Sequence, residues 1–452
     1  MKRFNRRMGW IIVGLVGLLI VIAALVISHR RLADPLLNNA APGEAVQVGA
    51  HGPLTLTFPE PVQPAVLESA FALDPPVSGR LTWNEAQGQS AVFWPEQPLV
   101  PGQRYTLRLQ AGAIFRAERT WQVEVRQPDL LYLAPSRAPE LWQVQADGQN
   151  PRALTTTGGA IYDYTVALDG SRILYSARNE QGGIDLWELE RGAKSPDLLL
   201  PCGTDWCIEP AYSPDLQKIA YSRRTFSGLP GSEPGAPRLW IYERAANATD
   251  ALLRDPALGG SAAAWSPDGR FLVFTDPRAA VVRWIDFQDK TDFFVPAGAD
   301  SRAVWAPDGA SFYMTKTESG EEHPYVVVYE VDAFTREARL WNAGNDSAET
   351  DYSLPIPSPD GAWLAVSHRQ IGGGPGKQLW LVRADGSQPR AVAQDALANY
   401  AGYRWDPSSE RLVFQRLHLS GSDSLPQIVL WNRKDGQQLT IAEDAFLPHW
   451  LP

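Results

Sequence analysis

A turn motif that recurs along most of the chain constrains the fold more than any other feature. Its clearest copy is Trp-Ser-Pro-Asp-Gly at Trp265–Gly269, and Trp305–Gly309 is the next. In such a turn Pro fixes φ, Asp caps the backbone and Gly supplies a positive φ. The copies, spaced 40 to 53 residues apart, fall at Val166, Tyr212, Trp265, Trp305, Pro357, Trp405 and Trp450. A period near 45 residues, filled with short strands, is typical of a β-propeller.

The segments between the turns predict the number of blades. A short apolar strand such as Phe271–Thr275 follows each turn as the second strand of its blade, and the next strand often contains Leu-Trp, as at Leu239–Trp240. The first unit, from Leu130, lacks a strand before its turn, whereas the last, Phe446–Trp450, lacks strands after it. The two parts complete each other. We therefore predict seven four-stranded blades in which the last strand closes the ring against the first, leaving no open edge.

The repeats of residues 128–452 resemble the TolB-type propeller family. Its mark is the Trp-Ser-Pro-Asp-Gly turn, followed by an apolar strand and a strand with Leu-Trp or Leu-Tyr. The resemblance implies the fold and says little about function. TolB itself has a soluble α/β domain before a six-bladed propeller, and this chain differs on both points, so the partners of TolB are not carried over.

Residues 41–127 predict a separate antiparallel β-sandwich. Leu54–Phe58, Tyr105–Leu109 and Trp121–Val125 alternate apolar and polar side chains, as half-buried strands do. The pattern Pro-Leu-Val-Pro-Gly-Gln-Arg-Tyr at Pro98–Tyr105 resembles bacterial Ig-like domains of the S-layer type. The resemblance implies a spacer or adhesion module.

The N-terminal segment predicts a membrane anchor. Trp10–Ile27 is entirely apolar or Gly and, at 1.5 Å per residue, just spans a hydrocarbon core of about 30 Å. Four basic residues precede it: Lys2, Arg3, Arg6 and Arg7. A cleaved signal peptide would need a shorter apolar run and a small-x-small cleavage site. We predict an uncleaved single-pass anchor in the cytoplasmic membrane over residues 1–31. Its N-terminus is expected inside, residues 32–40 form a tether, and the rest of the chain is extracytoplasmic.

Charge and cysteine content agree with an envelope location. The formal net charge of −10 argues against nucleic acid as a partner. Cys202 and Cys207 are the only cysteines, and such a short loop closes readily as a disulfide in an oxidising compartment. A redox dithiol is the alternative.

The search for catalytic chemistry finds no known motif. A Gly-x-Ser-x-Gly elbow, HExxH, a Walker A loop and a dinucleotide fingerprint are all absent, so no catalytic residue, metal or cofactor is assigned. His323, His368 and His418 follow second strands of three successive blades, and they form either a metal trio or solvated loop residues. The turn aspartates form either a carboxylate array or simple turn caps, and we predict caps: Asp169, Asp215, Asp268, Asp308 and Asp360.

One pattern indicates a binding face. A basic residue follows the second strand of every blade, in the set Arg137, Arg178, Arg223, Arg224, Arg278, Lys316, Arg369 and Arg416. Such a ring on an acidic protein could hold an anionic partner. The alternative is pairing with acids on the same face, which stabilises by about 0–1 kcal/mol per exposed pair. Those acids are Asp205, Asp255, Asp300, Asp346, Glu349, Asp351, Asp395, Glu443 and Asp444. The long loop Arg223–Arg238 adds Phe226 and Leu229 as apolar contacts.

The sequence thus predicts a non-enzymatic, membrane-anchored envelope protein whose propeller binds a protein or an anionic glycan. The alternative is a propeller enzyme, such as a lactonase, lyase or glycan hydrolase, with its site at the channel mouth. A bound metal or paired carboxylates facing the channel would favour the enzyme. A third possibility is a sensory or assembly subunit that acts through the membrane helix.

Overall fold

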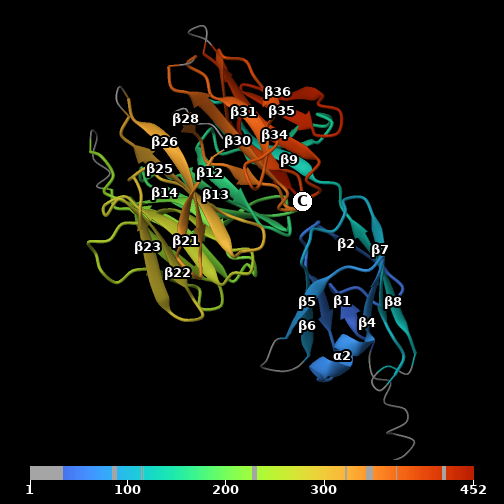
Figure 1. Ribbon diagram of the computed structural model, residues 1–452. Coiled ribbons are helices and arrows are strands. Elements are labelled where there is room, and N and C mark those ends of the chain that lie inside the picture. Colours follow the sequence, from blue (N-terminus) through green and yellow to red (C-terminus); the bar gives the residue numbers. More distant parts are fainter. Residues whose placement is uncertain are drawn as a thin grey trace, which may run out of the picture. The chain divides into compact units, whose positions relative to one another are not determined.

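The computed structural model describes residues 34–83, 89–112, 115, 117–226, 232–320, 323–342, 350–372, 374–419 and 424–452. This part of the chain is all-β apart from one short helix, α2 (Pro64–Ala70), as Figure 1 shows. It forms two compact units. Unit 1 comprises residues 1–46, 53–94 and 104–124, and unit 2 comprises residues 47–52, 95–103 and 125–452.

Unit 1 consists of two four-stranded sheets. One has the order β1 (Leu36–Leu37), β3 (Leu54–Thr57), β6 (Ser90–Pro95) and β5 (Gly79–Trp83). The other has the order β2 (Ala45–Val48), β8 (Arg119–Val125), β7 (Arg104–Leu109) and β4 (Phe71–Asp74). Phe71 of β4 and Phe93 of β6 have ring centroids 4.8 Å apart, so the two sheets share an apolar core. The predicted strands β3, β7 and β8 are confirmed.

Two features of unit 1 were not predicted from the sequence. The helix α2 begins with Pro64, which suits a first helical position, and it buries Leu67. The strand β1 lies within residues 32–40, which the sequence analysis assigned to a tether, and it pairs with β3. Both segments are short and have no clear hydrophobic period, so only their packing in unit 1 identifies them.

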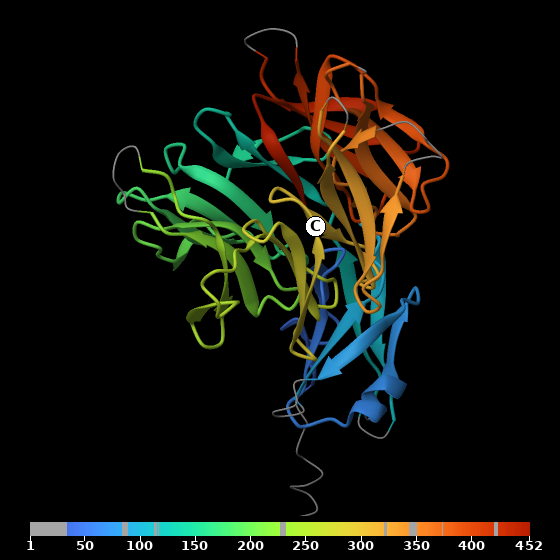
Figure 2. The same cartoon turned by 60° about the vertical axis from the view of Figure 1, so that its left-hand side comes forward.

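Unit 2 is built from repeated antiparallel sheets arranged as the blades of a β-propeller (Figures 1 and 2). Strands that form one blade are given together, beginning with β9 (Asp129–Ala134), β10 (Glu140–Gln145), β11 (Arg152–Ala153) and β37 (Phe446–Leu451), and then β12 (Ile161–Val166), β13 (Arg172–Arg178), β14 (Ile184–Glu190) and β15 (Asp197–Leu200). The next three groups are β16 (Trp206–Tyr212), β17 (Lys218–Arg224), β18 (Arg238–Glu243) and β19 (Ala248–Ala251); β20 (Ser261–Trp265), β21 (Phe271–Asp276), β22 (Val281–Asp286) and β23 (Thr291–Pro296); and β24 (Ala303–Trp305), β25 (Ser311–Glu318), β26 (Tyr325–Asp332) and β27 (Ala338–Trp341). The last two are β28 (Thr350–Tyr352), β29 (Ile356–Pro357), β30 (Trp363–Gln370), β31 (Gln378–Arg383) and β32 (Arg390–Ala393); and β33 (Ala398–Trp405), β34 (Arg411–His418), β35 (Gln427–Asn432) and β36 (Gln438–Glu443). A single parallel pair, Ile184 with Trp206, joins the sheets of β14 and β16.

The last strand closes the ring against the first, as predicted. β37 pairs with β9 in an antiparallel register that includes Trp450 with Leu130 and Leu451 with Asp129. Trp450 and Leu451 are both buried, each in a different apolar cluster. The edge of β9 is therefore covered by a strand from the far end of unit 2.

The recurrent turn is explained by its hydrogen bonds. In the clearest copy, Ser266 Oγ donates to Asp268 Oδ1 at 2.6 Å, the Arg270 N–H donates to the same oxygen at 3.0 Å, and Gly269 has φ +75°. Equivalent backbone N–H groups donate to the other turn aspartates: Asp169, Asp215, Asp308 and Asp360. These aspartates are turn caps, as predicted.

The tryptophan of the turn has a role that the sequence did not reveal. Trp265 Nε1 donates to the carbonyl of Ala211 at 3.2 Å, and Trp305 Nε1 donates to that of Ala264 at 2.9 Å. In each case the acceptor lies on the innermost strand of the preceding blade. The motif therefore joins neighbouring blades as well as turning the chain.

The predicted membrane anchor, residues 1–31, lies outside the described residues. Within the described ranges, no helix has the length and apolar character needed to cross a membrane.

Candidate binding site on the loop face of the propeller

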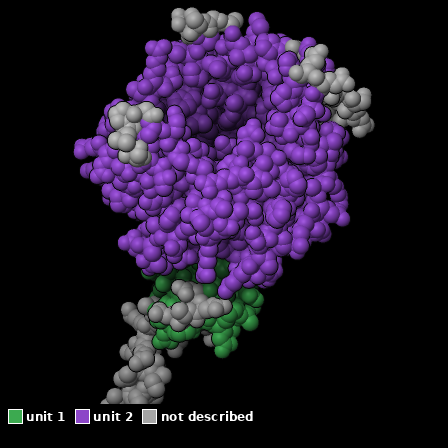
Figure 3. Space-filling model, turned by 90° about the vertical axis from the view of Figure 1, so that its left-hand side faces the viewer, with its two compact units in different colours: residues 1–46, 53–94, 104–124 green, residues 47–52, 95–103, 125–452 purple. Residues whose placement is uncertain are grey.

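The predicted cations gather on one face of unit 2. Corresponding strands of the blades run in the same direction, so the second strands all end at the same face, which we call the loop face. The unit is hollowed near its centre (Figure 3). Arg178, Arg224, Lys316, Arg369 and Arg416 lie at the ends of second strands, while Arg137 and Arg278 follow just after them. The structure therefore supports the register on which the predicted ring depended.

Several cations of this ring are neutralised by acidic residues or held by hydrogen bonds. Arg223 pairs with Asp205 at 2.8 Å, Arg369 with Asp351 at 3.1 Å and Lys316 with Glu318 at 2.6 Å. Asp205 and Asp351 are among the acids expected to compete for these cations. Arg416 donates two hydrogen bonds to Gln427, and Arg278 donates to the carbonyls of Pro256 and Ala257.

The remaining cations make no ion pair with any described residue. Arg137 and Arg178 are exposed, and Nε of Arg224 is buried without a hydrogen-bond partner. Leu229, which was predicted to contribute an apolar contact, lies outside the described residues. Arg178 and Arg224 lie close to the junction of two blades, where the parallel pair Ile184 with Trp206 joins β14 to β16.

Aromatic side chains lie beside these two arginines. We call the whole group the Trp206 cluster: Tyr162, Arg178, Trp206, Arg224 and Phe226. The ring of Trp206 lies 6.2 Å from that of Tyr162 and 5.5 Å from that of Phe226, measured between centroids. The guanidinium of Arg178 lies 6.0 Å from the centroid of Trp206, a cation–π contact. Trp206 is paired with Arg224 across β16 and β17. Arg178, Arg224 and Phe226 were predicted from the sequence, whereas Tyr162 and Trp206 were not, because neither belongs to the repeated motif.

A rigid loop holds the Trp206 cluster in place. The predicted disulfide between Cys202 and Cys207 is present and closes the loop that leads into β16. Asp185 accepts a hydrogen bond from the Cys202 N–H at 2.7 Å and another from Asn179 at 2.9 Å. Asp205 binds the Arg223 side chain and accepts a hydrogen bond from the Phe226 N–H at 3.2 Å. The backbone beside Trp206 and at Phe226 is therefore fixed before any ligand arrives.

Two neighbouring carboxylates on innermost strands were also missed by the sequence analysis. Asp163 Oδ2 accepts a hydrogen bond from the Glu209 N–H at 2.7 Å, and its other oxygen accepts one from Ser176. Glu209 accepts hydrogen bonds from Ser222 at 2.8 Å and from the Ala262 N–H at 2.9 Å. It also pairs with Arg302 at 3.0 Å. Each carboxylate thus links its own blade to the next.

The environments of the two carboxylates move their pKa values in opposite directions. Burial raises the pKa of Asp163 to about 7, and the charge of Glu209 adds to the rise. Burial also acts to raise the pKa of Glu209, but the Ala262 N–H and the charge of Arg302 outweigh it, so its net pKa lies below the ordinary value. In the sequence, the signal that could have identified this site is the single acidic residue, Asp163, within the short strand Ile161–Val166.

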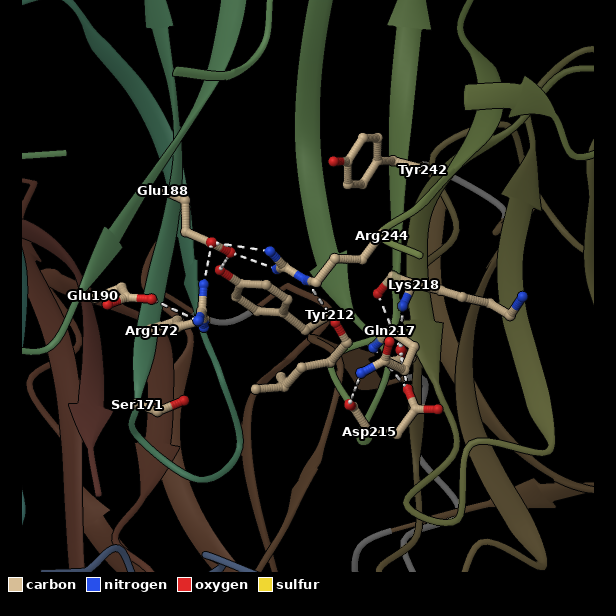
Figure 4. A network of polar contacts seen from close by, with 12 residues as sticks. Ser171, Arg172, Glu188, Glu190, Tyr212, Asp215, Gln217, Lys218, Tyr242 and Arg244 are labelled. Carbon is tan, nitrogen blue, oxygen red and sulfur yellow. Dashed lines mark hydrogen bonds and ion pairs between the residues drawn. The ribbon is translucent and has the colours of Figure 1, made fainter. Parts of the chain in front are cut away.

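A polar network around Glu188 is structural (Figure 4). Glu188 is 7% exposed and receives Arg172 at 2.5 Å, Arg244 at 2.7 Å and the Tyr212 hydroxyl at 2.7 Å. Arg172 and Glu188 come from one blade, whereas Tyr212 and Arg244 come from the next. Both oxygens of Glu188 are occupied, so the network holds two blades together and offers no site for a ligand.

The three candidate histidines do not form a metal site. No group of three or more His, Cys, Asp or Glu suited to a metal ion is found in the described part of the chain. His368 lies between the rings of Tyr352 and Trp380, at 5.4 and 5.7 Å. His418 lies 3.5 Å from Asp395, and His323 is exposed.

A pocket of about 360 Å³ lies at the opposite end of the propeller from the loop face. Its lining is mainly apolar and includes residues of the recurrent turns: Pro214, Trp265, Pro267, Trp405 and Pro407. These residues already form the turns and the contacts between blades, so we assign no ligand-binding role to the lining of the pocket.

Comparisons with known proteins leave the function open. No family model matches the chain, and no curated protein matches its sequence. Among solved structures, it is similar to TolB from Acinetobacter baumannii (13% identity, 86% of each chain, TM-score 0.44). It is also similar to a puromycin-hydrolysing peptidase from Mycobacterium tuberculosis (16% identity, 89% of this chain and 57% of that one, TM-score 0.51). A third similar structure is an oligogalacturonate lyase in complex with manganese (11% identity, 78% of this chain and 96% of that one, TM-score 0.50).

These likenesses concern the fold. The chain spans little more than half the length of the peptidase, and all three identities are low. The peptidase and the lyase carry different activities on a similar fold, so the fold alone assigns no function to this chain. Its repeated sheets and ring closure make unit 2 a β-propeller, and TolB-like proteins are among the structures that it resembles.

Proposed function

We propose that this chain is a non-enzymatic, membrane-anchored protein of the cell envelope. Residues 1–31 anchor it, an Ig-like domain over residues 41–127 acts as a spacer, and residues 128–452 form a seven-bladed propeller. The loop face of the propeller binds an anionic partner, either a protein or a glycan. The repeated sheets and the closure of β37 on β9 support the blade count.

The observation that carries this proposal is the set of arginines without acid partners on an otherwise acidic protein. Arg178 and Arg224 form no ion pair with a described residue, although Asp205 lies on the same face and pairs with Arg223. A guanidinium presents planar N–H donors that match carboxylate, sulfate and phosphate groups. Arginines of this kind, close together on a rigid scaffold, suit recognition of an anionic partner.

Reversing these charges tests the proposal. We expect the double variant Arg178→Glu, Arg224→Glu to bind the partner at least ten-fold more weakly, because each lost charge-assisted hydrogen bond costs about 1.5–3 kcal/mol. The immobilised full chain would capture partners from envelope extract of the source cell. The control is Arg339→Glu, since the Arg339 side chain is 78% exposed and lies on β27. Equal retention of the same partner by wild type and the double variant would contradict the proposal.

A second candidate function is catalysis by Asp163 and Glu209. It is favoured by their adjacency and by pKa values displaced in opposite directions, a pattern that enzymes use to separate an acid from a base. Both carboxylates are engaged in hydrogen bonds within and between blades, which favours the binding protein. Turnover of a panel of glycans or lactones by wild type, and its loss in Asp163→Asn, would favour the enzyme instead.

A further inference from the structure

We propose that the Trp206 cluster binds an acidic sugar: a saccharide ring stacked on the aromatic side chains, with a carboxylate, sulfate or phosphate group held by Arg178 and Arg224. The inference rests on the proposed function and names the class of ligand for the same face. It comes from the aromatic residues of the cluster, which the charge argument did not use.

The aromatic side chains supply an apolar surface beside the charges. Tyr162 is 43% exposed, which is unusual for a large aromatic residue on an innermost strand. Its ring and that of Phe226 both contact the Trp206 ring, tilted by 54° and 51° to it. A sugar ring has an apolar C–H face that packs on such a surface and hydroxyl groups that reach polar atoms at its edge. Trp206 Nε1 is buried and has no hydrogen-bond partner among the described residues.

The arginines lie where an anionic substituent of a stacked sugar would be. The Arg178 guanidinium lies 6.0 Å from the centre of the Trp206 ring, so a ligand in contact with that ring is close to its N–H donors. Arg224 lies opposite Trp206 in the adjacent strand, and its Nε has no partner. One ligand can therefore contact the aromatic surface and the guanidinium donors at the same time.

This combination favours a glycan over an acidic peptide. An acidic peptide would satisfy the arginines, but its acidic side chains carry no apolar face that could pack on the aromatic rings. An acidic sugar carries both features on one rigid ring, which reduces the entropy lost on binding. The disulfide loop and the hydrogen bonds that Asp185 and Asp205 accept from the N–H groups of Cys202 and Phe226 hold the backbone beside Trp206 and at Phe226, so little backbone ordering is needed on the protein side.

Calorimetric titration of the full chain tests this inference. The probes are a tetrasaccharide of uronic acids, the neutral hexose tetrasaccharide of the same linkage and a tetraglutamate peptide. We expect the uronic acid to bind best. Trp206→Ala should weaken this binding by about ten-fold or more, as loss of one stacking contact does, and Trp206→Phe should retain most of it. Arg178→Glu should remove the preference for the acidic over the neutral sugar.

Two results would overturn the inference: uronic acid binding unaffected by Trp206→Ala, or tetraglutamate binding as tightly as the sugar. Near-ultraviolet circular dichroism verifies folding, and Tyr162→Ala replaces Trp206→Ala if the latter does not fold. The outcomes separate the two proposals. If Arg178→Glu, Arg224→Glu loses the envelope partner while Trp206→Ala retains it, the charged binding face stands and the acidic sugar is rejected. If the double variant retains that partner while Trp206→Ala loses uronic acid binding, the sugar site stands and the proposed partner binding is rejected.

Discussion

Glu188→Gln is expected to lower the free energy of unfolding of the propeller by about 3–5 kcal/mol, the usual cost of removing one partner from a buried ion pair. Glu188 is buried and receives hydrogen bonds from Arg172, Arg244 and Tyr212, which come from two blades. The neutral amide keeps the shape but loses the charge that compensates two arginines. It also replaces one acceptor oxygen with a donor. Urea unfolding followed by tryptophan fluorescence measures the change.

A neighbouring residue provides a matched control. Glu190 lies on the same strand and pairs with the same Arg172, at 2.6 Å, but its side chain is 57% exposed. Glu190→Gln should therefore cost no more than about 1 kcal/mol. Equal losses in the two variants would show that burial and the link between blades do not matter, and would contradict the role given to Glu188.

The contribution of this network to the stability of the propeller is expected to decrease at low pH. Burial acts to raise the pKa of Glu188, but the hydrogen bonds of Arg244 and Tyr212 and the charges of the two arginines more than offset it. The net pKa lies below the ordinary value, so the folded state releases this proton more readily than the unfolded state. The contribution of Glu188 is therefore present above its unfolded pKa and is lost as the pH falls through the folded pKa.

The elements that could be predicted from the sequence are those fixed by local chemistry. The turn at Trp265–Gly269 needs Pro, Asp and Gly at set positions, and its spacing places every blade and the closing strand β37. The Cys202–Cys207 disulfide follows from proximity along the chain. Corresponding strands of the blades run in the same direction, so the sequence alone predicts that Arg178 and Arg224, at the ends of second strands, lie on one face.

The remaining features depend on contacts between segments that are far apart in the sequence. Glu188 meets Arg244 only because two blades are neighbours, and Tyr162 meets Trp206 for the same reason. None of these residues belongs to a motif, and each looks like an ordinary member of an alternating strand. The sequence also could not show which cations are paired, because Arg223 and Arg224 are adjacent in the chain and only Arg223 meets Asp205.

Asp163 is expected to make the propeller less stable as the pH rises from about 4 to about 7. Burial raises the pKa of Asp163 to about 7 in the folded state, whereas an unfolded aspartate has a pKa near 3.8. Between these values the folded chain holds a proton that the unfolded chain has released, so stability falls by up to about 1.4 kcal/mol per pH unit. Below the unfolded pKa both states are protonated and the penalty vanishes. Above the folded pKa both are ionised and the penalty is constant.

The variant Asp163→Asn isolates this contribution. Asparagine stays neutral, its amide oxygen can accept the hydrogen bond of the Glu209 N–H, and its amide can donate to Ser176, so the link between blades is retained. We expect the variant to gain stability relative to wild type by roughly 4 kcal/mol between pH 4 and pH 8, measured as the difference in unfolding free energy at each pH. The control is Asp308→Asn in an exposed turn, where the hydrogen bond from the Ala310 N–H also survives. A difference between wild type and Asp163→Asn that does not change with pH would mean that Asp163 is ionised in the fold throughout. Its carboxylate would then be an ordinary charged link between blades, and the case for acid chemistry at this position would fall with it.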